Sequence, residues 1–427
     1  MKYYRDEILP GVYLTALQTD KFKNGCLSAL FLAQLQRETA AAYGLVPFVL
    51  RRGTRTLPTM EAVSGRLDEL FGSALEPSLR RKGEIQFVGM RADFCDDRYL
   101  PGGEKILDDI FALFGELLLR PNTKGGLLLP EYVDSERTQL IQRLESVKNE
   151  KRSYAARRLL ENMCCYEDYG VGAAGDVANA EAIRYVRLTR DYQSLISTSP
   201  MEIFYCGGEP ASRIREGLAT ALETLPRGEL NEELGTDIRM NSVEEKVRYF
   251  SETMDVTQGC LSMGYRLGEC MEDPDYAALR VFNSVFGGCV TSKLFENVRE
   301  KMSLCYYASS SVDLHKGIMI VNSGIDFANY EVAMDAINAQ LEAMRRGEIS
   351  ERELSGAKEA LCNAFRASED SPSALESFYL DQTVLGLDYG PAELAALVEE
   401  VTAEQVTEIA RSVVPDAVFF LKGESAE

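Results

Sequence analysis

Histidine is almost absent from this chain, since His315 is the only one among 427 residues. A metal site that takes two histidine ligands from the chain is therefore excluded. His315 stands directly before Lys316-Gly317, where a hairpin edge is expected. A lone histidine in such a place is more typical of the surface than of a metal site, so we expect no histidine-based metal centre.

The ten cysteines lack the spacing that metal sites and disulfide frameworks show. None belongs to a Cys-x-x-Cys pair, which gives no thiolate zinc motif. Several stand in apolar, strand-like runs, so we expect them to be reduced and buried. Long apolar stretches are missing as well. No run reaches the roughly 18 residues of a membrane span, and the first ten residues have no apolar signal-peptide core, so we expect no membrane segment and no secretion signal.

Positive charge is scarce relative to negative charge. Lysine and arginine total 46 against 67 aspartates and glutamates, which gives a net charge of -21 and a pI near 4.7. Such a surface repels nucleic-acid backbones and anionic lipid. We therefore expect a cytoplasmic protein with neither nucleic acid nor membrane as a partner.

The sequence contains an internal repeat. Gly25-Cys26-Leu27-Ser28 recurs as residues 259–262, and Lys82-Gly83 recurs as Lys316-Gly317, both at a separation of 234 residues. Each half also ends in an apolar run followed by glycine, at residues 202–208 and 417–423. Two anchors at one separation predict two homologous domains.

Hydrophobic periodicity predicts the elements of the first half. Expected strands are 12–18, 26–32, 76–79, 85–92 and 203–206, and expected helices are 40–51, 59–71, 104–119 and one long helix from 130 to about 164. Strands grouped with helices, without a strict βαβ rhythm, indicate an α+β fold in which a mainly antiparallel sheet is covered by helices on one face. The polar, turn-rich residues 226–242 are the expected linker between domains 1–225 and 243–427.

One stretch carries a family resemblance. Residues 287–306 read Gly-Gly-Cys-Val-Thr-Ser-Lys-Leu-Phe-Glu-Asn-Val-Arg-Glu-Lys-Met-Ser-Leu-Cys-Tyr. This run resembles the second-half signature of the pitrilysin/insulinase-type zinc peptidases, and the resemblance covers nearly the whole chain. It implies two homologous domains that form half of a clamshell. It also implies that Arg299 and Tyr306 hold the substrate peptide.

The same resemblance locates a zinc site that this chain does not possess. In the family, an inverted His-x-x-Glu-His motif stands on a helix before a Gly-Thr pair, here Gly53-Thr54. Counting back places Gly44, Pro47 and Phe48 at the motif, and we expect Pro47 to disturb the helix. Anchoring on Gly44-Leu45 instead gives Pro47, Leu50 and Arg51.

Neither register supplies a zinc ligand or a general base. The family's third ligand is a glutamate seven residues after another glutamate. Glu136 matches the earlier one, and the ligand position then falls on Arg143, whose positive charge repels a metal ion. We therefore expect no bound metal, no cofactor and no hydrolysis by the chain alone.

Arg299 and Tyr306 are also interpretable without the resemblance. Arg299 closes an expected helical segment, 292–300, and Tyr306 opens an expected strand, 306–312. A guanidinium offers forked donors to a peptide carbonyl and a phenol adds a further donor, so the pair suits an extended peptide at a sheet edge. A solvated arginine and a half-buried tyrosine remain the alternative.

The resemblance implies the non-catalytic subunit of a heterodimeric zinc endopeptidase, whose partner is a zinc-bearing homologue. A scaffold or binding protein of the same fold, such as a homodimer or a helper in elongation factor P modification, is the alternative. An enzyme of another class is not indicated, because no phosphate-binding loop or Gly-x-Ser-x-Gly motif is present. The glycine-rich residues 170–175 mimic a dinucleotide fingerprint, but no strand precedes them, and we expect a loop.

Overall fold

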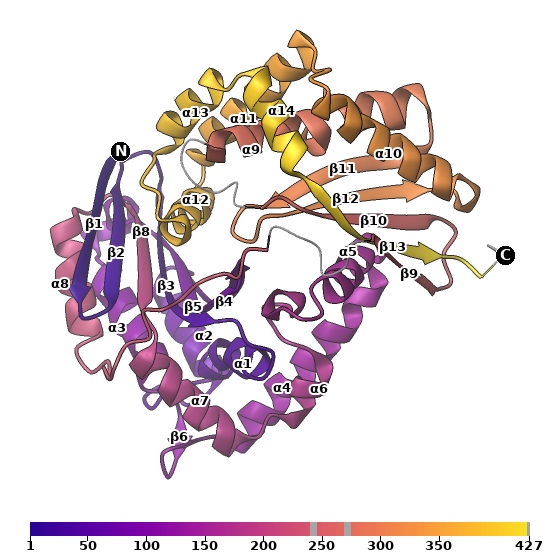
Figure 1. Ribbon diagram of the computed structural model, residues 1–427. Coiled ribbons are helices and arrows are strands. Elements are labelled where there is room, and N and C mark those ends of the chain that lie inside the picture. Colours follow the sequence, from indigo (N-terminus) through magenta and orange to yellow (C-terminus); the bar gives the residue numbers. More distant parts are fainter. Residues whose placement is uncertain (240–245, 269–274, 425–427) are drawn as a thin grey trace. The chain divides into compact units, whose positions relative to one another are not determined.

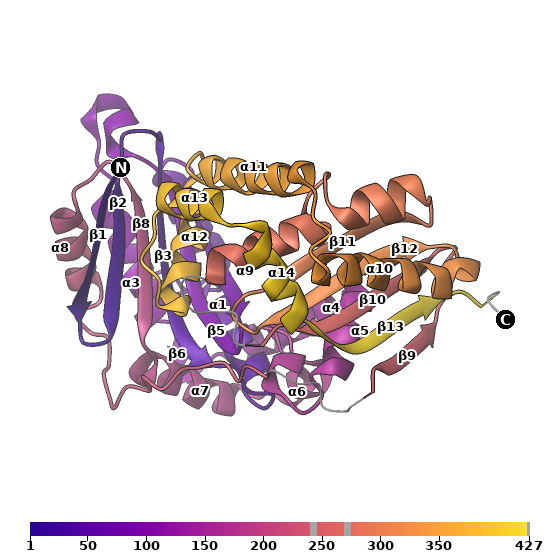
Figure 2. The same ribbon diagram turned by 45° about the horizontal axis from the view of Figure 1, so that its top comes forward.

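The computed structural model describes residues 1–239, 246–268 and 275–424 (Figure 1, Figure 2). Two compact units emerge. The first comprises residues 1–145, 171–235 and 372–380, and the second comprises 146–170, 236–371 and 381–427. Each unit is built on one main β-sheet with helices against it, which confirms the predicted α+β fold with two homologous halves.

The first unit contains a six-stranded sheet of order β1-β2-β8-β3-β5-β4. Alternate residues of these strands share one apolar core with helices α1, α3, α7 and α8 on the same face. The elements are β1 Lys2–Leu9, β2 Val12–Gln18, β3 Asn24–Gln34, α1 Ala40–Leu50, α2 Met60–Glu69, β4 Ala74–Lys82, β5 Ile85–Cys95, α3 Leu107–Leu119, β6 Thr123–Lys124, β7 Leu127–Leu128, α4 Pro130–Ser146, α6 Val177–Ala182, α7 Tyr185–Thr198, β8 Met201–Gly207 and α8 Ala211–Ala221.

The second unit contains a five-stranded sheet of order β11-β12-β10-β13-β9. Its elements are α5 Lys151–Met163, β9 Arg248–Thr253, β10 Gly259–Arg266, α9 Asp275–Asn283, the π-helical segments η5 Ser284–Gly288 and η6 Leu294–Lys301, β11 Cys305–Asp313, β12 Ile318–Ile325, α10 Tyr330–Arg345, α11 Glu351–Ser368, α12 Pro372–Leu385, α13 Pro391–Glu400, α14 Ala403–Ser412 and β13 Val414–Lys422.

The two sheets repeat one pairing pattern. In both, a parallel pair (β2 with β8, β9 with β13) is followed by three antiparallel pairings. The repeated Lys-Gly dipeptides form the matching turns β4–β5 and β11–β12, where Gly83 and Gly317 have φ values of 54° and 64°. A left-handed residue at these turns favours glycine, which explains why this dipeptide was a visible anchor of the repeat.

The halves exchange equivalent helices. Helix α5 comes from the first half of the sequence but packs on the second sheet, against Cys260, Phe419 and Leu421. The start of α12, which comes from the second half, packs on the first sheet through Leu375. The predicted single helix 130–164 is therefore wrong: a 3-10 turn at Val147–Asn149 separates α4 from α5, because the chain passes there from one unit to the other.

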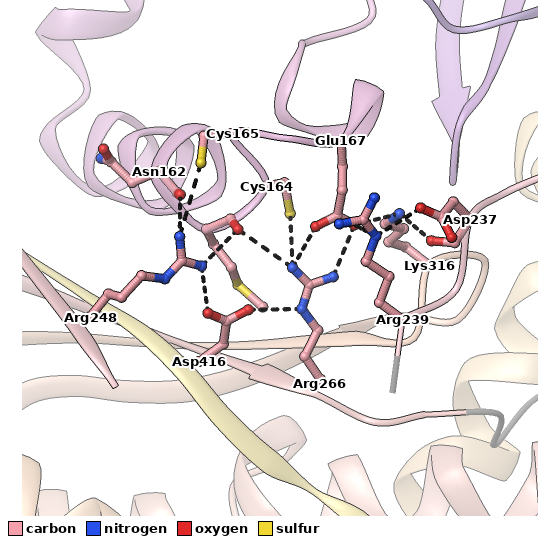
Figure 3. A network of polar contacts seen from close by, with 11 residues as sticks. Asn162, Cys164, Cys165, Glu167, Asp237, Arg239, Arg248, Arg266, Lys316 and Asp416 are labelled. Atoms are coloured by element: carbon pink, nitrogen blue, oxygen red, sulfur yellow. Dashed lines mark hydrogen bonds and ion pairs between the residues drawn. The ribbon is translucent and has the colours of Figure 1, made fainter. Parts of the chain in front are cut away.

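A network of buried charged side chains links residues 146–170, the segment that contains α5, to the second sheet (Figure 3). Arg266 of β10 donates to Glu167, just after α5, at 2.6 and 3.0 Å, and its Nε donates to Asp416 at 2.8 Å. Lys316 lies 2.8 Å from the second Glu167 oxygen. The side chains of all four residues are 0% exposed. Buried charges are tolerated only when paired and hydrogen-bonded, so this network fixes where the segment folds.

Cys164 lies beside this network. Burial raises the pKa of its thiol to about 12, so it stays protonated near neutral pH and is inert as a nucleophile. Five of the nine described cysteines are buried, and Cys270 lies outside the described residues. Among the described helices, none combines the length and the apolarity that crossing a membrane requires.

Most of the predicted linker, residues 226–242, is held by hydrogen bonds to the rest of the chain. Gly228 and Asn231 donate to the carbonyls of Ser197 and Thr198 in the first unit, at 2.9 and 2.8 Å. Lys316 then donates to the carbonyl of Asp237 in the second unit. The linear division at 226–242 stays a prediction, because residues 240–242 lie outside the described residues and the two compact units each include a segment from the other half.

Candidate functional site

The positions predicted to replace zinc ligands lie on α1 and α4. The guanidinium carbon of Arg143 on α4 lies 4.0 Å from the centre of the Phe48 ring on α1. Two ligands of one metal ion must be neighbours, so this contact favours the register that places Gly44, Pro47 and Phe48 at the motif. Where the family places a histidine and a glutamate, this chain has a cation–π pair.

Gly44 is closely packed against neighbouring residues. A Cβ there would lie 3.1 Å from Leu79 Cδ2 and 3.3 Å from the carbonyl oxygen of Ala173. Ala173 belongs to the glycine-rich residues 170–175, which form a loop before α6, as predicted. In this loop Gly175 has a φ of 71°, and its Cα lies so close to Ala41 that a Cβ would collide. The loop therefore closes over the α1 face that a histidine would need.

Pro47 does not disturb the helix, and that expectation is wrong. Helix α1 runs through it to Leu50, and the carbonyl of Pro47 accepts from the Arg51 amide at 3.1 Å. Most of α1 is buried. Tertiary packing therefore outweighs the hydrogen bond that proline cannot donate.

The second register also fails to make a metal site. Leu50 is a core residue, and the Arg51 Nε donates to the Leu75 carbonyl at 2.7 Å. Glu136, a buried carboxylate, is held by Arg52 at 2.6 Å. Over residues 1–239, 246–268 and 275–424, no three side chains of His, Cys, Asp or Glu gather so that they could hold a metal ion. The residues present do not fit zinc.

Restoring the motif is expected to fail. We predict that the variant Gly44→His/Pro47→Glu/Phe48→His/Arg143→Glu retains no zinc after dialysis, because the side chain at position 44 meets the 170–175 loop. The measurement is zinc content by mass spectrometry together with circular dichroism. The matched control keeps Gly44 and carries the other three changes, and it is expected to fold. Stoichiometric zinc in the folded four-residue variant would contradict this account of the closed site.

Arg299 and Tyr306 lie at one end of strand β11. Arg299 is on η6, and its guanidinium stacks 4.5 Å from the centre of the Phe295 ring and lies 3.6 Å from Glu300. Tyr306 is 63% exposed, and its hydroxyl donates to Asp326 at 3.1 Å. This hydrogen bond raises the pKa of Tyr306 above its ordinary value, so the phenol keeps its proton. Neither side chain is buried in a core.

The backbone at this pair is irregular in ways that the first unit does not repeat. The β11–β12 register shifts between Cys305 and Tyr307, so Tyr306 is the extra residue of a β-bulge. The equivalent β4–β5 pairing has no shift. Segment η6 is π-helical, whereas its counterpart α2 is a regular α-helix. Bulges and π-turns re-aim side chains and are frequent at functional sites.

The turn between the two residues belongs to the fold itself. Ser303 has a left-handed φ of 52°, but Phe71 has a φ of 58° at the matching turn of the first unit. The strain is therefore shared by both halves, and only the bulge and the π-helical segment are specific to the Arg299–Tyr306 region.

Sequence reasoning did not identify Phe295 and Asp326 as neighbours of the pair. Phe295 stands four residues before Arg299, a spacing that places both on one helical face and that was available in the sequence. Asp326 follows β12, and only the pairing of β11 with β12 brings it to Tyr306. No local pattern indicates that contact.

His315 was predicted to be a surface residue, and that prediction is wrong. It is 8% exposed, with Nδ1 3.5 Å from Asp313 and Nε2 3.7 Å from Asp381. The hairpin turn that carries it is covered by α12, which supplies Asp381. Neither distance is that of a hydrogen bond, and the described residues around His315 form no group that could hold a metal ion.

Comparisons with known proteins find relatives over nearly the whole chain. Residues 183–361 match the family model described as Peptidase M16 inactive domain. The chain is 32% identical over 415 residues to the probable inactive metalloprotease YmfF of Bacillus subtilis strain 168, covering 97% of this chain and 96% of that one. It is 24% identical over 374 residues to the antilisterial bacteriocin subtilosin biosynthesis protein AlbE of the same strain, covering 85% and 88%.

A solved structure of a conserved protein from Enterococcus faecalis V583 has a TM-score of 0.88 and 28% identity, covering 99% of both chains. Similarity therefore extends over both halves, not only over the segment that carries Arg299 and Tyr306.

Proposed function

We propose that this chain, which belongs to the M16 peptidase family as an inactive homologue, is the substrate-binding subunit of a two-subunit zinc endopeptidase. The family membership and the lost zinc ligands are its premises. In this role the chain holds an extended peptide and a zinc-bearing homologue cleaves it. A cytoplasmic location is part of the same proposal.

The observation that carries the proposal is the bulge at Tyr306. A bulge lies at an exposed tyrosine, and the π-helical segment before it carries Arg299, so two hydrogen-bond donors stand near one end of β11. The matching edge of the first unit has neither feature. Both differences stand in or beside a pair of strands that the two sheets otherwise repeat, β11–β12 and β4–β5.

The chemistry suits a peptide backbone. Strand β11 is the outer strand of its sheet and pairs only with β12 among the described strands, so its other edge can accept an extended chain. The Arg299 guanidinium offers forked donors to a carbonyl or carboxylate, and the Tyr306 hydroxyl offers one more. Both contacts position a substrate and leave bond cleavage to the partner's metal.

A scaffold or binding protein without any link to proteolysis is the second candidate, either as a homodimer or as a helper in elongation factor P modification. The existing contacts favour it: Tyr306 is already bonded to Asp326, and Arg299 is already stacked on Phe295. These contacts hold the two side chains without a ligand.

The proposed role is tested by reconstituting the peptidase from its two separated subunits. The chain is isolated from its native host with whatever homologue accompanies it, and the two are then purified apart. We expect hydrolysis of a quenched fluorescent peptide mixture only after the two are combined, with a rate that saturates at equal amounts. A chain that recovers as a homodimer, with no zinc-bearing homologue and no activity in the mixture, would exclude the proposed role and favour the scaffold.

A further inference from the structure

The first sheet has a strand that the second sheet lacks. In the first unit, β1 pairs antiparallel with β2 and covers its outer edge. In the second unit β9 occupies the place of β2, because each pairs in parallel with the strand that ends its half. Among the described strands, none pairs with the outer edge of β9. The outer edge of β9 is therefore unpaired in the described part of the chain, whereas the equivalent edge of β2 is paired with β1.

Helix α5 packs on one face of β9, but on the other face none of the described helices takes the place that α8 has in the first unit. In the first unit α8 approaches α3 so closely that a Cβ on Gly217 would collide with the Phe111 ring. Helix α10 holds the place of α3 in the second unit and packs on α14, but among the described residues no helix follows β13 as α8 follows β8. Tyr249 of β9 is consequently 59% exposed, although its position on the first sheet corresponds to a covered residue.

The uncovered surface is hollowed into a pocket of about 740 Å³. Aromatic side chains dominate its wall, and the Tyr330 and Phe420 rings lie 4.5 Å apart. Lys422 and Asp326 are its charged residues. The Asp326 carboxylate accepts from Tyr306, whereas no described acidic residue forms an ion pair with Lys422. One positive charge is therefore available within an aromatic pocket.

Strand β9 lacks two of the usual protections of an exposed edge, although it carries the charged residues Arg248 and Glu252, which are bonded within the unit. Residues 248–253 contain no proline, and their register with β13 runs without a bulge from Ala417–Arg248 to Lys422–Thr253. Natural edge strands are commonly blocked by prolines, bulges or inward charges. Tyr249, Ser251 and Thr253 are the exposed residues of the strand and share one side. A strand added to β9 would place alternate side chains on that side, above the pocket.

We propose that the outer edge of β9 binds an extended segment of a partner protein as an antiparallel strand, in the place that β1 takes on the first sheet. An aromatic or large aliphatic side chain of the segment fills the pocket. An acidic side chain two or four residues away meets Lys422, which is paired with Thr253 in the sheet register. This surface lies on the opposite edge of the sheet from Tyr306 and goes beyond the peptide-holding role.

The probe is a phage-displayed library of random peptides about eight residues long, the length of an added strand. We expect selection on the full chain to enrich peptides with an aromatic or large aliphatic residue and an acid at even spacing. A synthetic copy of an enriched peptide should bind in fluorescence polarisation. Binding should weaken by about tenfold or more for Tyr249→Ala and for Lys422→Glu.

Two controls separate strand addition from adhesion to an apolar surface. The variant Tyr166→Ala removes a 75% exposed tyrosine of the same unit and should bind as the parent does. Methylating the peptide amides of one alternate set should abolish binding, and methylating the other set should not, because only one set faces the added edge.

Three outcomes would overturn the proposal: no enrichment above that on Tyr249→Ala, equal binding of that variant, or a dimer of this chain joined through β9 in light scattering. The Arg299→Ala variant, which leaves the hydrogen bond from Tyr306 to Asp326 in place, is expected to bind the selected peptides normally. Failure of the subunit role would therefore leave this test intact, and failure of this test would leave the subunit role intact.

Discussion

Replacing Glu167 by glutamine is expected to destabilise the second unit by about 3–5 kcal/mol, the usual cost of breaking a buried ion pair. The carboxylate accepts two bonds from Arg266 and pairs with Lys316, and all three side chains are fully buried (Figure 3). Glutamine preserves the shape but removes the charge. Arg266 then keeps Asp416 as a counter-charge, and Lys316 loses its ion pair with the carboxylate.

The measurement is hydrogen–deuterium exchange of β10 and β12 together with urea unfolding, since a chain of two units need not unfold in one step. The matched control is Glu342→Gln, which breaks the ion pair between Arg345 and the 52% exposed Glu342 side chain and should cost less than about 1 kcal/mol. Adding Lys316→Met to Glu167→Gln should recover part of the loss. Exchange rates like those of the parent would show that the network does not hold the exchanged segment.

Acidification should weaken the parent more than the Glu167→Gln variant. Burial pushes the pKa of Glu167 up, but the bonds from Arg266 and Lys316 outweigh it and hold the pKa below its ordinary 4.5. A carboxyl whose pKa is depressed in the folded state stabilises that state above the unfolded pKa. That contribution is lost as the pH falls through the folded pKa. The difference in stability between parent and variant should therefore shrink below about pH 4.5.

In the reconstituted pair, Arg299→Ala combined with Tyr306→Phe is expected to lower kcat/KM by about ten- to hundredfold, the range seen when a positioned substrate loses its orienting contacts. Arg299 loses its guanidinium, and Tyr306, the bulged residue, loses its hydroxyl. Both residues are partly or largely exposed, so the fold should survive. The effect is expected only with the zinc-bearing partner present, since this chain alone has no metal-binding residues at the motif.

The control for this prediction is Arg346→Ala/Tyr166→Phe, which changes the same two residue types at exposed positions. It should leave turnover within twofold of the parent, roughly the scatter of surface changes. Unchanged turnover in the Arg299/Tyr306 variant, with the pair still assembled, would remove the peptide-holding role from these residues.

Much of the fold was predictable from the sequence because the backbone of both halves requires the same residue type at equivalent turns. Gly83 and Gly317 stand where both hairpins need a left-handed residue, and most of the expected first-half strands lie within observed ones. Strand β1 was missed because it is an edge strand with Ile8 as its only fully buried residue, so its apolar alternation is weak. The break between α4 and α5 was missed because helical periodicity does not report which unit a helix packs on.

The candidate site was partly predictable for similar reasons. Gly44, Phe48 and Arg143 show in the sequence that zinc ligands are missing, yet only the structure shows Arg143 stacked on Phe48 and a loop closed over Gly44. Tyr306 was named from its motif, but the bulge that distinguishes it depends on pairing with β12. The open edge of β9 is visible only when the two sheets are compared.

The decisive measurement is the zinc-to-protein ratio of the chain purified alone, obtained by mass spectrometry beside a peptide-hydrolysis assay. We expect no retained zinc and no hydrolysis, because Phe48 and Arg143 stack where two ligands would stand. One zinc ion per chain with hydrolysis in the absence of any partner would contradict this expectation.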